Sequence, residues 1–290
     1  MSGIPGAGRL TVVALAAVSA GLAYPWRSPT DTWVLGVAAA TVVLALIWWR
    51  GSYLTTIVAR RIRVLLHRKL IQAAPADLRP VGVDVVTTVL IRVDSHDREL
   101  PIGLLGGYLD RYGLACDSVR VTTRTAAGAT TTWIGLTFSG ARNLAALQGR
   151  SAQIPLRQTA ESAARRLVSH LREIDWTATL VEPSQVPELV AADARERWRS
   201  VTDARGHLST YAVDVPETLA AVRSVAAAEA WTVVEIAGPS PRDRVRAGAA
   251  IRTEEQPAAS PPLPGLVPIP GRQASALAAL HPLSGIRLLN

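Results

Sequence analysis

The amino-acid sequence predicts an α+β domain that follows an N-terminal hairpin of two transmembrane helices. Three observations lead to this fold class. Two uncharged apolar runs open the 290-residue chain, strand and helix patterns alternate over residues 80–255, and the net charge of +8 gathers at one end. Hydrophobic residues make up 49 % of the chain, which excludes a disordered protein.

The charge distribution narrows the possible partners. Residues 1–70 contain eight basic residues and one acidic residue, whereas residues 71–290 contain 23 basic and 22 acidic residues. A nucleic-acid-binding domain would carry a basic face of its own, so we expect no nucleic acid as a partner. Cys116 is the single cysteine, which excludes an internal disulfide and a cysteine-based zinc site.

The two apolar runs form the predicted transmembrane hairpin, residues 1–50. The spans cover about residues 10–26 and 32–49, close to the roughly 17–25 apolar residues that a bilayer requires. Aromatic residues mark the ends of the runs, and basic residues follow the second run, so the positive-inside rule places the N-terminus and everything after residue 50 in the cytoplasm. The expected membrane-anchoring residues are Tyr24, Trp26, Trp33, Trp48, Trp49, Arg50, Arg60, Arg61 and Arg63.

Two alternatives compete with this assignment. The first run could be a cleaved signal peptide, and the second could be a buried core helix. The flanking charges favour two spans in the inner (plasma) membrane. Residues 51–79 form the expected basic juxtamembrane helix and linker, which would bind anionic phospholipid or pack on a partner subunit.

Residues 80–255 form the predicted cytoplasmic α+β domain. The clearest helix is expected over residues 158–174, because Ala160, Ala163, Ala164, Leu167, Val168, Leu171 and Ile174 fall on one helical face. A hairpin is expected around residues 126–128. The other expected helices are 100–112, 141–148 and 216–230, and the other expected strands are 81–93, 176–181, 197–201, 208–213, 231–236 and 244–252.

A Pro-rich C-terminal segment, residues 256–290, completes the predicted organisation. Residues 257–270 are typical of an extended linker or wrapping segment. Residues 272–290 are expected to form a short helix and a tail, which would dock back on the domain or bind a neighbour.

Few patterns in the sequence indicate catalysis, cofactor binding or metal binding. The densest polar cluster at a strand end is Asp94-Ser95-His96-Asp97, whose carboxylates and imidazole could hold a divalent cation, although a solvated turn is favoured. The chain contains no P-loop and no G-x-S-x-G nucleophile motif. We therefore predict no catalytic residue, cofactor or metal site. Basic groups at Arg165-Arg166 and around Trp198 could meet an acidic partner, although solvated faces are favoured. The partner-binding prediction names Arg165, Arg172, Arg197 and Trp198.

One series of motifs resembles a known family. The series runs through Gly107-Tyr108-Leu109, Tyr112-Gly113-Leu114, Trp133-Ile134-Gly135-Leu136-Thr137, residues 143–148, Arg150-Ser151, residues 154–157, Thr159-Ala160, Arg165-Arg166-Leu167, Leu171-Arg172-Glu173 and Trp176. In order, spacing and topology it resembles the EccE family of type VII (ESX) secretion systems of mycobacteria and relatives, over residues 10–235. No pattern matches residues 256–290.

The resemblance implies a non-catalytic structural subunit of the inner-membrane secretion complex. EccB, EccC and EccD would be its partners, with EccC as the ATPase and EccD as the many-spanning subunit. The chain would brace the assembly from the cytoplasmic side and support protein export. The family's cytoplasmic domain is described as glycosyltransferase-like, which implies an alternative, a membrane-tethered enzyme acting at the inner leaflet. Asp94 and Asp97 have the wrong spacing for the Asp-x-Asp motif of such an enzyme.

Overall fold

The structure of the chain is a computed structural model, and it divides into two units, residues 1–67 and 68–290. It describes residues 7–22, 24, 29–46, 48–49, 52–53, 60–62, 64, 79–81, 84–94, 99–149, 155–214, 217–238 and 245–289. Of the predicted polar cluster at residues 94–97, only Asp94 therefore lies within the described residues.

The first unit contains two helices that contact each other, α1 (Ala7–Leu22) and α2 (Pro29–Leu46). Pro29 begins α2, a position that suits its fixed φ and missing N–H. Two short strands follow and pair antiparallel, β1 (Trp48–Trp49) and β2 (Ser52–Tyr53). None of the helices in the described part of the chain is both long and apolar enough to cross a membrane. The predicted spans are thus unconfirmed.

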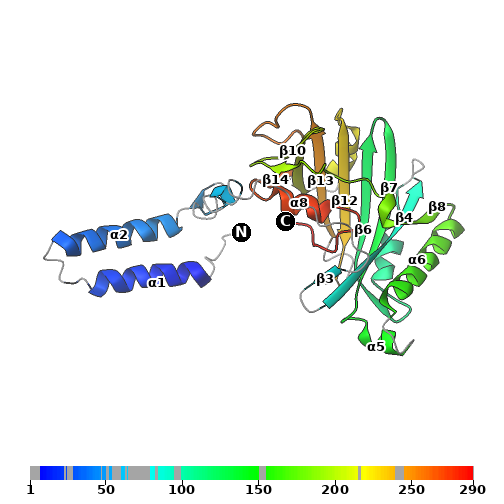
Figure 1. Ribbon diagram of the computed structural model, residues 1–290, viewed down its shortest axis with the longest axis horizontal. Coiled ribbons are helices and arrows are strands. Elements are labelled where there is room, and N and C mark those ends of the chain that lie inside the picture. The colour runs from blue at the N-terminus through cyan, green and yellow to red at the C-terminus, as the bar shows by residue number, and fades with distance from the viewer. Residues whose placement is uncertain are drawn as a thin grey trace. The chain divides into compact units, whose positions relative to one another are not determined.

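The second unit is built on one twelve-stranded sheet, so the predicted α+β class is confirmed. The main strand order is β3-β4-β7-β6-β12-β13-β11-β10-β9, and three further strands extend it, with β5 on β6, β8 on β4 and β14 on β11 (Figure 1). The strands are β3 (Arg79–Val81), β4 (Asp84–Asp94), β5 (Asp110–Arg111), β6 (Leu114–Ala126), β7 (Ala129–Ser139), β8 (Thr177–Val181), β9 (Arg195–Glu196), β10 (Val201–Asp203), β11 (Gly206–Val213), β12 (Glu229–Ile236), β13 (Val245–Thr253) and β14 (Leu266–Pro268).

All the strand pairs of the described residues are antiparallel. A nucleotide-binding crevice of the doubly wound type instead forms at the carboxyl ends of parallel strands. The glycosyltransferase-like part of the prediction therefore gains no support from this sheet.

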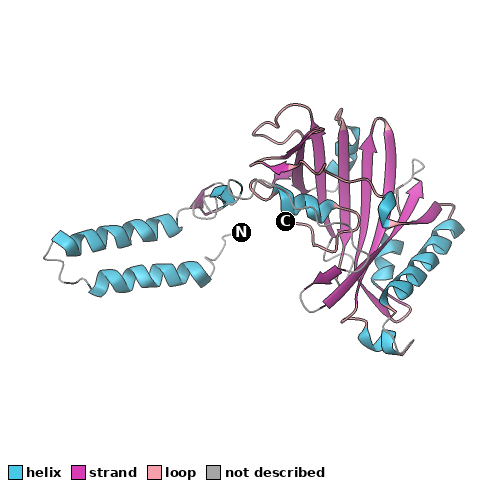
Figure 2. Ribbon diagram, in the orientation of Figure 1, coloured by secondary structure: helices cyan, strands magenta, loops and turns pink. Residues whose placement is uncertain are grey.

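Helices lie against both faces of the sheet (Figure 2). They are α4 (Ile102–Gly106), the 3-10 turn η1 (Gly107–Leu109), α5 (Leu144–Gln148), α6 (Leu156–Glu173), the 3-10 turn η2 (Pro183–Gln185), α7 (Thr218–Ser224) and α8 (Gln273–Leu280). Alternation along β12 separates the faces: Ile236 packs into the cluster under α6, while Trp231 and Val233 pack into the cluster under α8. The sheet is thus covered on both sides, which explains its buried strands.

The helix expected over residues 158–174 is confirmed, because it corresponds to α6. Its Ala-rich stripe is buried at Ala160, Ala163, Ala164, Leu167, Val168 and Leu171, and it packs on β4, β7 and β8. The basic His170 and Arg172 lie in the last turn, where they complement the helix dipole. Small side chains on this face bring the helix close to the sheet.

The predicted hairpin around residues 126–128 is also confirmed. Strands β6 and β7 pair up to Ala126 and Ala129, and the two turn residues Ala127 and Gly128 have φ of 50° and 75°. Two positive φ values define the turn type that matches the right-handed twist of adjoining strands.

Three sequence predictions were wrong in extent. The helix expected over 100–112 is only α4 and η1, because glycines weaken it and a left-handed turn at Tyr112 starts a hairpin. The helix expected over 216–230 ends at Ser224, and residues from Glu229 join the sheet, where Glu229 pairs with two arginines. Of the strand expected over 197–201, only Val201 belongs to a strand, β10, and residues 197–200 form a turn closed by a 2.7 Å hydrogen bond from the Arg197 N–H to the Ser200 carbonyl.

The C-terminal segment docks back on the sheet of its own chain. Strand β14 pairs with β11, and α8 contacts β11, β12 and β13. Arg120 of β6 holds the end of α8 and the tail after it, because its guanidinium donates to the carbonyl oxygens of Ala279 in α8 and of Ser284 and Ile286 in the tail, at 2.9, 2.6 and 2.6 Å. The segment therefore supplies part of the core.

Candidate interaction surfaces

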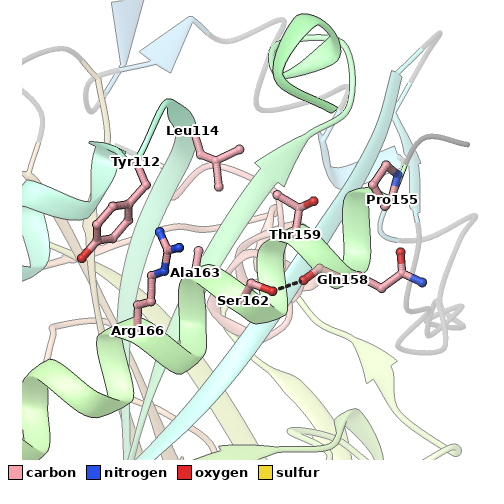
Figure 3. Close-up of a pocket in the computed structure, with 8 residues that line it drawn as sticks. All are labelled: Tyr112, Leu114, Pro155, Gln158, Thr159, Ser162, Ala163 and Arg166. Carbon is pink, nitrogen blue, oxygen red and sulfur yellow. Dashed lines mark hydrogen bonds between the residues drawn. The ribbon is translucent and has the colours of Figure 1, made fainter. Parts of the chain in front are cut away.

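A groove of about 350 Å³ lies between α6 and the turn that joins β5 to β6 (Figure 3). Its walls are mostly apolar, with Leu114 and Ala163 nearly buried at 5 % and 6 % exposure. Polar side chains lie along its rim. The lining residues are Tyr112, Leu114, Pro155, Gln158, Thr159, Ser162, Ala163 and Arg166.

Small side chains create this groove. Thr159, Ala163 and Arg166 follow one another at helical spacing along α6, so they share one side of the helix. The two smaller residues leave space next to Leu114, and Arg166 closes one end. Ser162 stands at the rim and donates its hydroxyl to the Gln158 carbonyl oxygen at 2.8 Å.

The opposite wall depends on a tight turn. Tyr112 and Gly113 have φ of 60° and 69°, and the flanking residues Arg111 and Leu114 pair directly across β5 and β6. A positive φ is unfavourable for a bulky side chain. The turn nevertheless presents the Tyr112 ring to the groove with 45 % exposure.

Two guanidinium groups share this ring. Arg166 lies 4.3 Å and Arg111 lies 5.2 Å from the centroid of Tyr112, and Arg111 is also 4.8 Å from the centroid of Tyr108. Such cation–π contacts leave the hydrogen-bonding edges of an arginine free. Burial raises the pKa of Tyr108 to about 12, so its phenol is neutral at physiological pH and offsets neither positive charge. Its hydroxyl contacts His170 Nδ1 at 3.4 Å.

The partner-binding residues predicted on α6 have partners inside the chain. Arg165 is exposed, and its guanidinium lies 3.8 Å from the carboxylate of Glu161 and 3.3 Å from Ser162. Arg172 donates from Nε and Nη2 to the carbonyl oxygen of Ala178 on the edge strand β8, at 3.1 and 2.8 Å. Of the pair, Arg165 is therefore the more available to a partner.

The other predicted partner-binding residues, Arg197 and Trp198, lie in the turn between β9 and β10. Arg197 is exposed and Trp198 is half-buried, with the Trp198 carbonyl accepting the Gly271 N–H at 2.8 Å. The neighbouring Glu196 accepts the Ala274 N–H at the start of α8, at 3.0 Å. These contacts join the turn to the C-terminal segment. The structure does not bring Arg197 and the α6 residues into one site.

The predicted membrane-anchoring residues are only partly described. Tyr24 and Trp33 are 70 % and 76 % exposed, Arg61 is exposed and Arg60 is half-buried. For Trp48 and Trp49 the structure describes the backbone alone, and Trp26, Arg50 and Arg63 lie outside the described residues.

The candidate metal cluster keeps only Asp94 within the described residues, where it is exposed and lies 3.5 Å from Arg92. Among the described side chains, no group of three or more histidine, cysteine or acidic residues could hold a metal. Burial raises the pKa of the Cys116 thiol to about 12, which makes it a poor nucleophile.

Two buried charge networks were missed by the sequence patterns. Arg120 pairs with Glu235 at 2.6 Å, and Arg252 pairs with Asp203 and Glu229 at 2.7 and 2.9 Å. The residues of the first pair face each other across β6 and β12, and Glu229 faces Arg252 across β12 and β13. These ion pairs can be recognised only when the register of the strands in the sheet is known.

The groove residue Tyr112 and the adjoining Arg111 were also missed as candidate binding residues. Both were expected within one helix, whereas the Tyr-Gly dipeptide before a strand is a turn signal of the kind that Gly in the left-handed region provides. Arg166 was noted with Arg165 as a basic pair, but its contact with Tyr112 depends on tertiary packing.

Comparisons with known proteins agree with the motif series. A family model described as type VII ESX secretion system translocon, EccE, matches residues 126–213. The chain is 42 % identical over 285 residues to the ESX-3 secretion system protein EccE3 of Mycolicibacterium smegmatis, covering 97 % of this chain and 89 % of that protein. It is 47 % identical over 297 residues to EccE3 of Mycobacterium tuberculosis, covering 98 % and 87 %. The matched family region spans β7, α6 and β11.

Proposed function

Because this chain belongs to the EccE family and is a component of a type VII (ESX) secretion system, we propose that it is a non-catalytic structural subunit of that machinery. The observation that carries the proposal is identity of 42–47 % over nearly the whole chain to ESX-3 components. The chain would brace the assembly from the cytoplasmic side and support protein export.

The chemistry of the described residues supports a structural role. Buried ion pairs connect strands to one another and to the C-terminal tail. Such groups specify packing, whereas a catalytic group would be placed at a cleft with a free reactive edge. The exposed arginines and the apolar groove are features that suit protein contacts.

The other Ecc subunits of the complex, EccB, EccC and EccD, are the proposed partners. Arg165, Arg197 and Trp198 are the proposed contact residues among those expected from the sequence. Arginine and tryptophan are enriched at the energetic centres of protein interfaces. Arg172 would contribute only by giving up its bonds to Ala178.

The N-terminal unit is the proposed anchor in the inner membrane. Its two helices, the exposed aromatic residues Tyr24 and Trp33, and the basic residues that follow them support this placement. Single cysteines at exposed positions of β13 and of the turn between α1 and α2 would report the orientation. In intact cells an impermeant maleimide should label the cysteine in the turn between α1 and α2, which the proposed orientation places outside, and should not label the cytoplasmic β13. Labelling of β13 from outside would reverse the proposed orientation.

Gene deletion tests the proposed function. Without the chain, secretion of the system's substrates should fall and the membrane complex should lose integrity on a native gel. Restoring the full chain should restore both. Normal secretion together with an intact complex in the deletion strain would contradict a structural role.

Mass spectrometry of the gently solubilised complex provides a second test. An affinity tag on the full chain should recover the ATPase and the many-spanning subunit together. A tagged chain that is isolated alone from cells with active secretion would contradict membership of a stable complex.

A further inference from the structure

We propose that the groove beside α6 binds an extended acidic segment of a partner subunit, with a carboxylate beside Arg111 and Arg166 and an apolar side chain against Leu114 and Ala163. The inference rests on the proposed function, because that function supplies the partner. It adds the site, its chemistry and the type of segment that fits there.

Arg166, which lines the groove, and Arg111, which adjoins it beside Tyr112, differ in their ion pairing from Arg157 and Arg165 of α6. Arg157 and Arg165 both have a carboxylate of Glu161 within 4.0 Å, at 2.8 and 3.8 Å. Within the described residues, no carboxylate lies within 4.0 Å of the guanidinium of Arg111 or Arg166, whose contacts are with aromatic faces. Each of these two guanidinium groups therefore contacts the Tyr112 ring and, in the described part of the chain, has no carboxylate close enough for an ion pair.

A carboxylate is the group that this arrangement fits. The planar guanidinium of arginine presents paired N–H donors that match a carboxylate in two parallel hydrogen bonds. A negative charge would also relieve the repulsion between the two guanidinium groups. The Tyr112 ring restricts the position of each arginine beforehand, so a ligand would have less side-chain entropy to remove.

The shape of the groove limits the size of the occupant. About 350 Å³ accommodates a few side chains and no folded domain. Its floor is apolar at Leu114 and Ala163, and Gln158 and Ser162 provide hydrogen-bonding groups at the rim. This combination selects a short segment that carries an acidic residue next to an aliphatic one.

Site-specific photo-crosslinking in the full chain tests the inference. Ser162 at the rim is replaced by p-benzoylphenylalanine, and Ser169 on the same helix provides the matched control because it is exposed and does not line the groove. In cells that assemble the secretion complex, irradiation should join position 162 to another subunit. The crosslinked peptide, identified by mass spectrometry, should contain Asp or Glu close to the crosslink. Position 169 should give little of this adduct.

Reversing the charge of Arg111 and Arg166 then tests whether formation of the crosslinked adduct depends on these two arginines. In the chain labelled at position 162, the double variant Arg111→Glu and Arg166→Glu should reduce the adduct about tenfold or more, because two attractions become repulsions. Arg223→Ala, which removes an exposed positive charge from α7 and does not touch the groove lining, should leave it unchanged. Co-purification of the complex from both variants shows that the chain remains folded and assembled.

The outcomes separate this inference from the proposed function. An intact complex without an adduct at position 162 overturns the inference and leaves the proposed function standing. An adduct with lipid, with residues 150–154 of the same chain or with a second copy overturns it as well. Recovery of the tagged chain without other subunits overturns the proposed function and the inference together.

Discussion

Arg120 of β6 and Glu235 of β12 face each other at directly paired positions of the sheet, with 2.6 Å between guanidinium and carboxylate and almost no exposure of either side chain. The same guanidinium binds four carbonyl oxygens, one near the end of α8 and three in the tail after it, and Glu235 accepts the Leu288 N–H at 3.2 Å. Burial lowers the pKa of Arg120, and the charge of Glu235 opposes that shift. One buried pair therefore joins two central strands to the last residues of the chain.

Glu235→Gln should destabilise the protein by about 3–5 kcal/mol, because Arg120 would remain buried without a counter-charge. The free energy of unfolding, measured for the full chain by urea denaturation, checks this value. Hydrogen exchange at Ile286 and Leu288 should accelerate at the same time, since the tail loses its attachment.

Arg287 provides the matched control for this variant. It pairs with the other carboxylate oxygen of Glu235 at 3.1 Å, but its side chain is 47 % exposed. Arg287→Ala should therefore cost only about 0–1 kcal/mol. Equal stability losses for the two variants would show that the buried pair has no special role.

Asp203 should contribute stability at neutral pH that disappears in acid. Its burial raises the pKa, but the hydrogen bonds from the Ala191 and Arg205 N–H groups and the charge of Arg252 outweigh burial and lower the pKa. A carboxylate with a lowered folded-state pKa stabilises the fold above its unfolded pKa of about 3.9, and the contribution is lost as the pH falls through the folded value.

Urea titrations of the wild type and Asp203→Asn between neutral pH and about pH 3 measure this effect. The difference in unfolding free energy should be largest at neutral pH and should shrink below about pH 4. A difference that stays constant over the whole range would mean that ionisation of Asp203 does not stabilise the fold.

Local patterns explain which elements the sequence could predict. The α6 helix carries its own buried stripe, and the hairpin around Ala127 and Gly128 has a short turn between two strand-like runs. Each signal lies within about twenty residues, so no knowledge of the remaining chain is needed.

The pairs that connect distant segments could not be predicted in this way. Arg120 and Glu235 are 115 positions apart in the chain, and Arg120 and Ser284 are 164 apart. Their partnership follows from strand order and register, which the sequence of one strand does not encode. The groove has the same origin, because Tyr112 meets Arg166 only after α6 has packed beside β5 and β6.

Gly113→Ala should destabilise the chain by about 1–2 kcal/mol. Gly113 has φ of 69°, and an added Cβ would meet no atom within 4 Å, so the cost is conformational and not a clash. Gly107→Ala is the control, because Gly107 has equally open space and φ of −65°. That variant should be stable or gain about 0.4–1 kcal/mol. Thermal unfolding compares the two, and a similar loss at both positions would contradict the assigned left-handed turn.

Arg172→Ala should promote self-association through β8. This strand pairs with β4 on one side, and in the described residues no strand covers its other side. Exposed strand edges pair readily with other chains, and charged side chains are one way in which proteins prevent it. Arg172 occupies the Ala178 carbonyl oxygen with two N–H groups. Light scattering of the purified chain should therefore show larger species for this variant.

Arg165→Ala is the control that distinguishes loss of the Arg172 bond at the edge of β8 from a mere loss of positive surface charge. Both variants remove one positive charge from α6, but Arg165 bonds only to exposed groups of its own helix, Glu161 and Ser162. Its removal should cost at most about 0.5 kcal/mol and leave the chain in its original oligomeric state. Self-association of both variants to the same degree would attribute the effect to net charge, whereas association of Arg172→Ala alone identifies the bond to Ala178 as the protection of this edge.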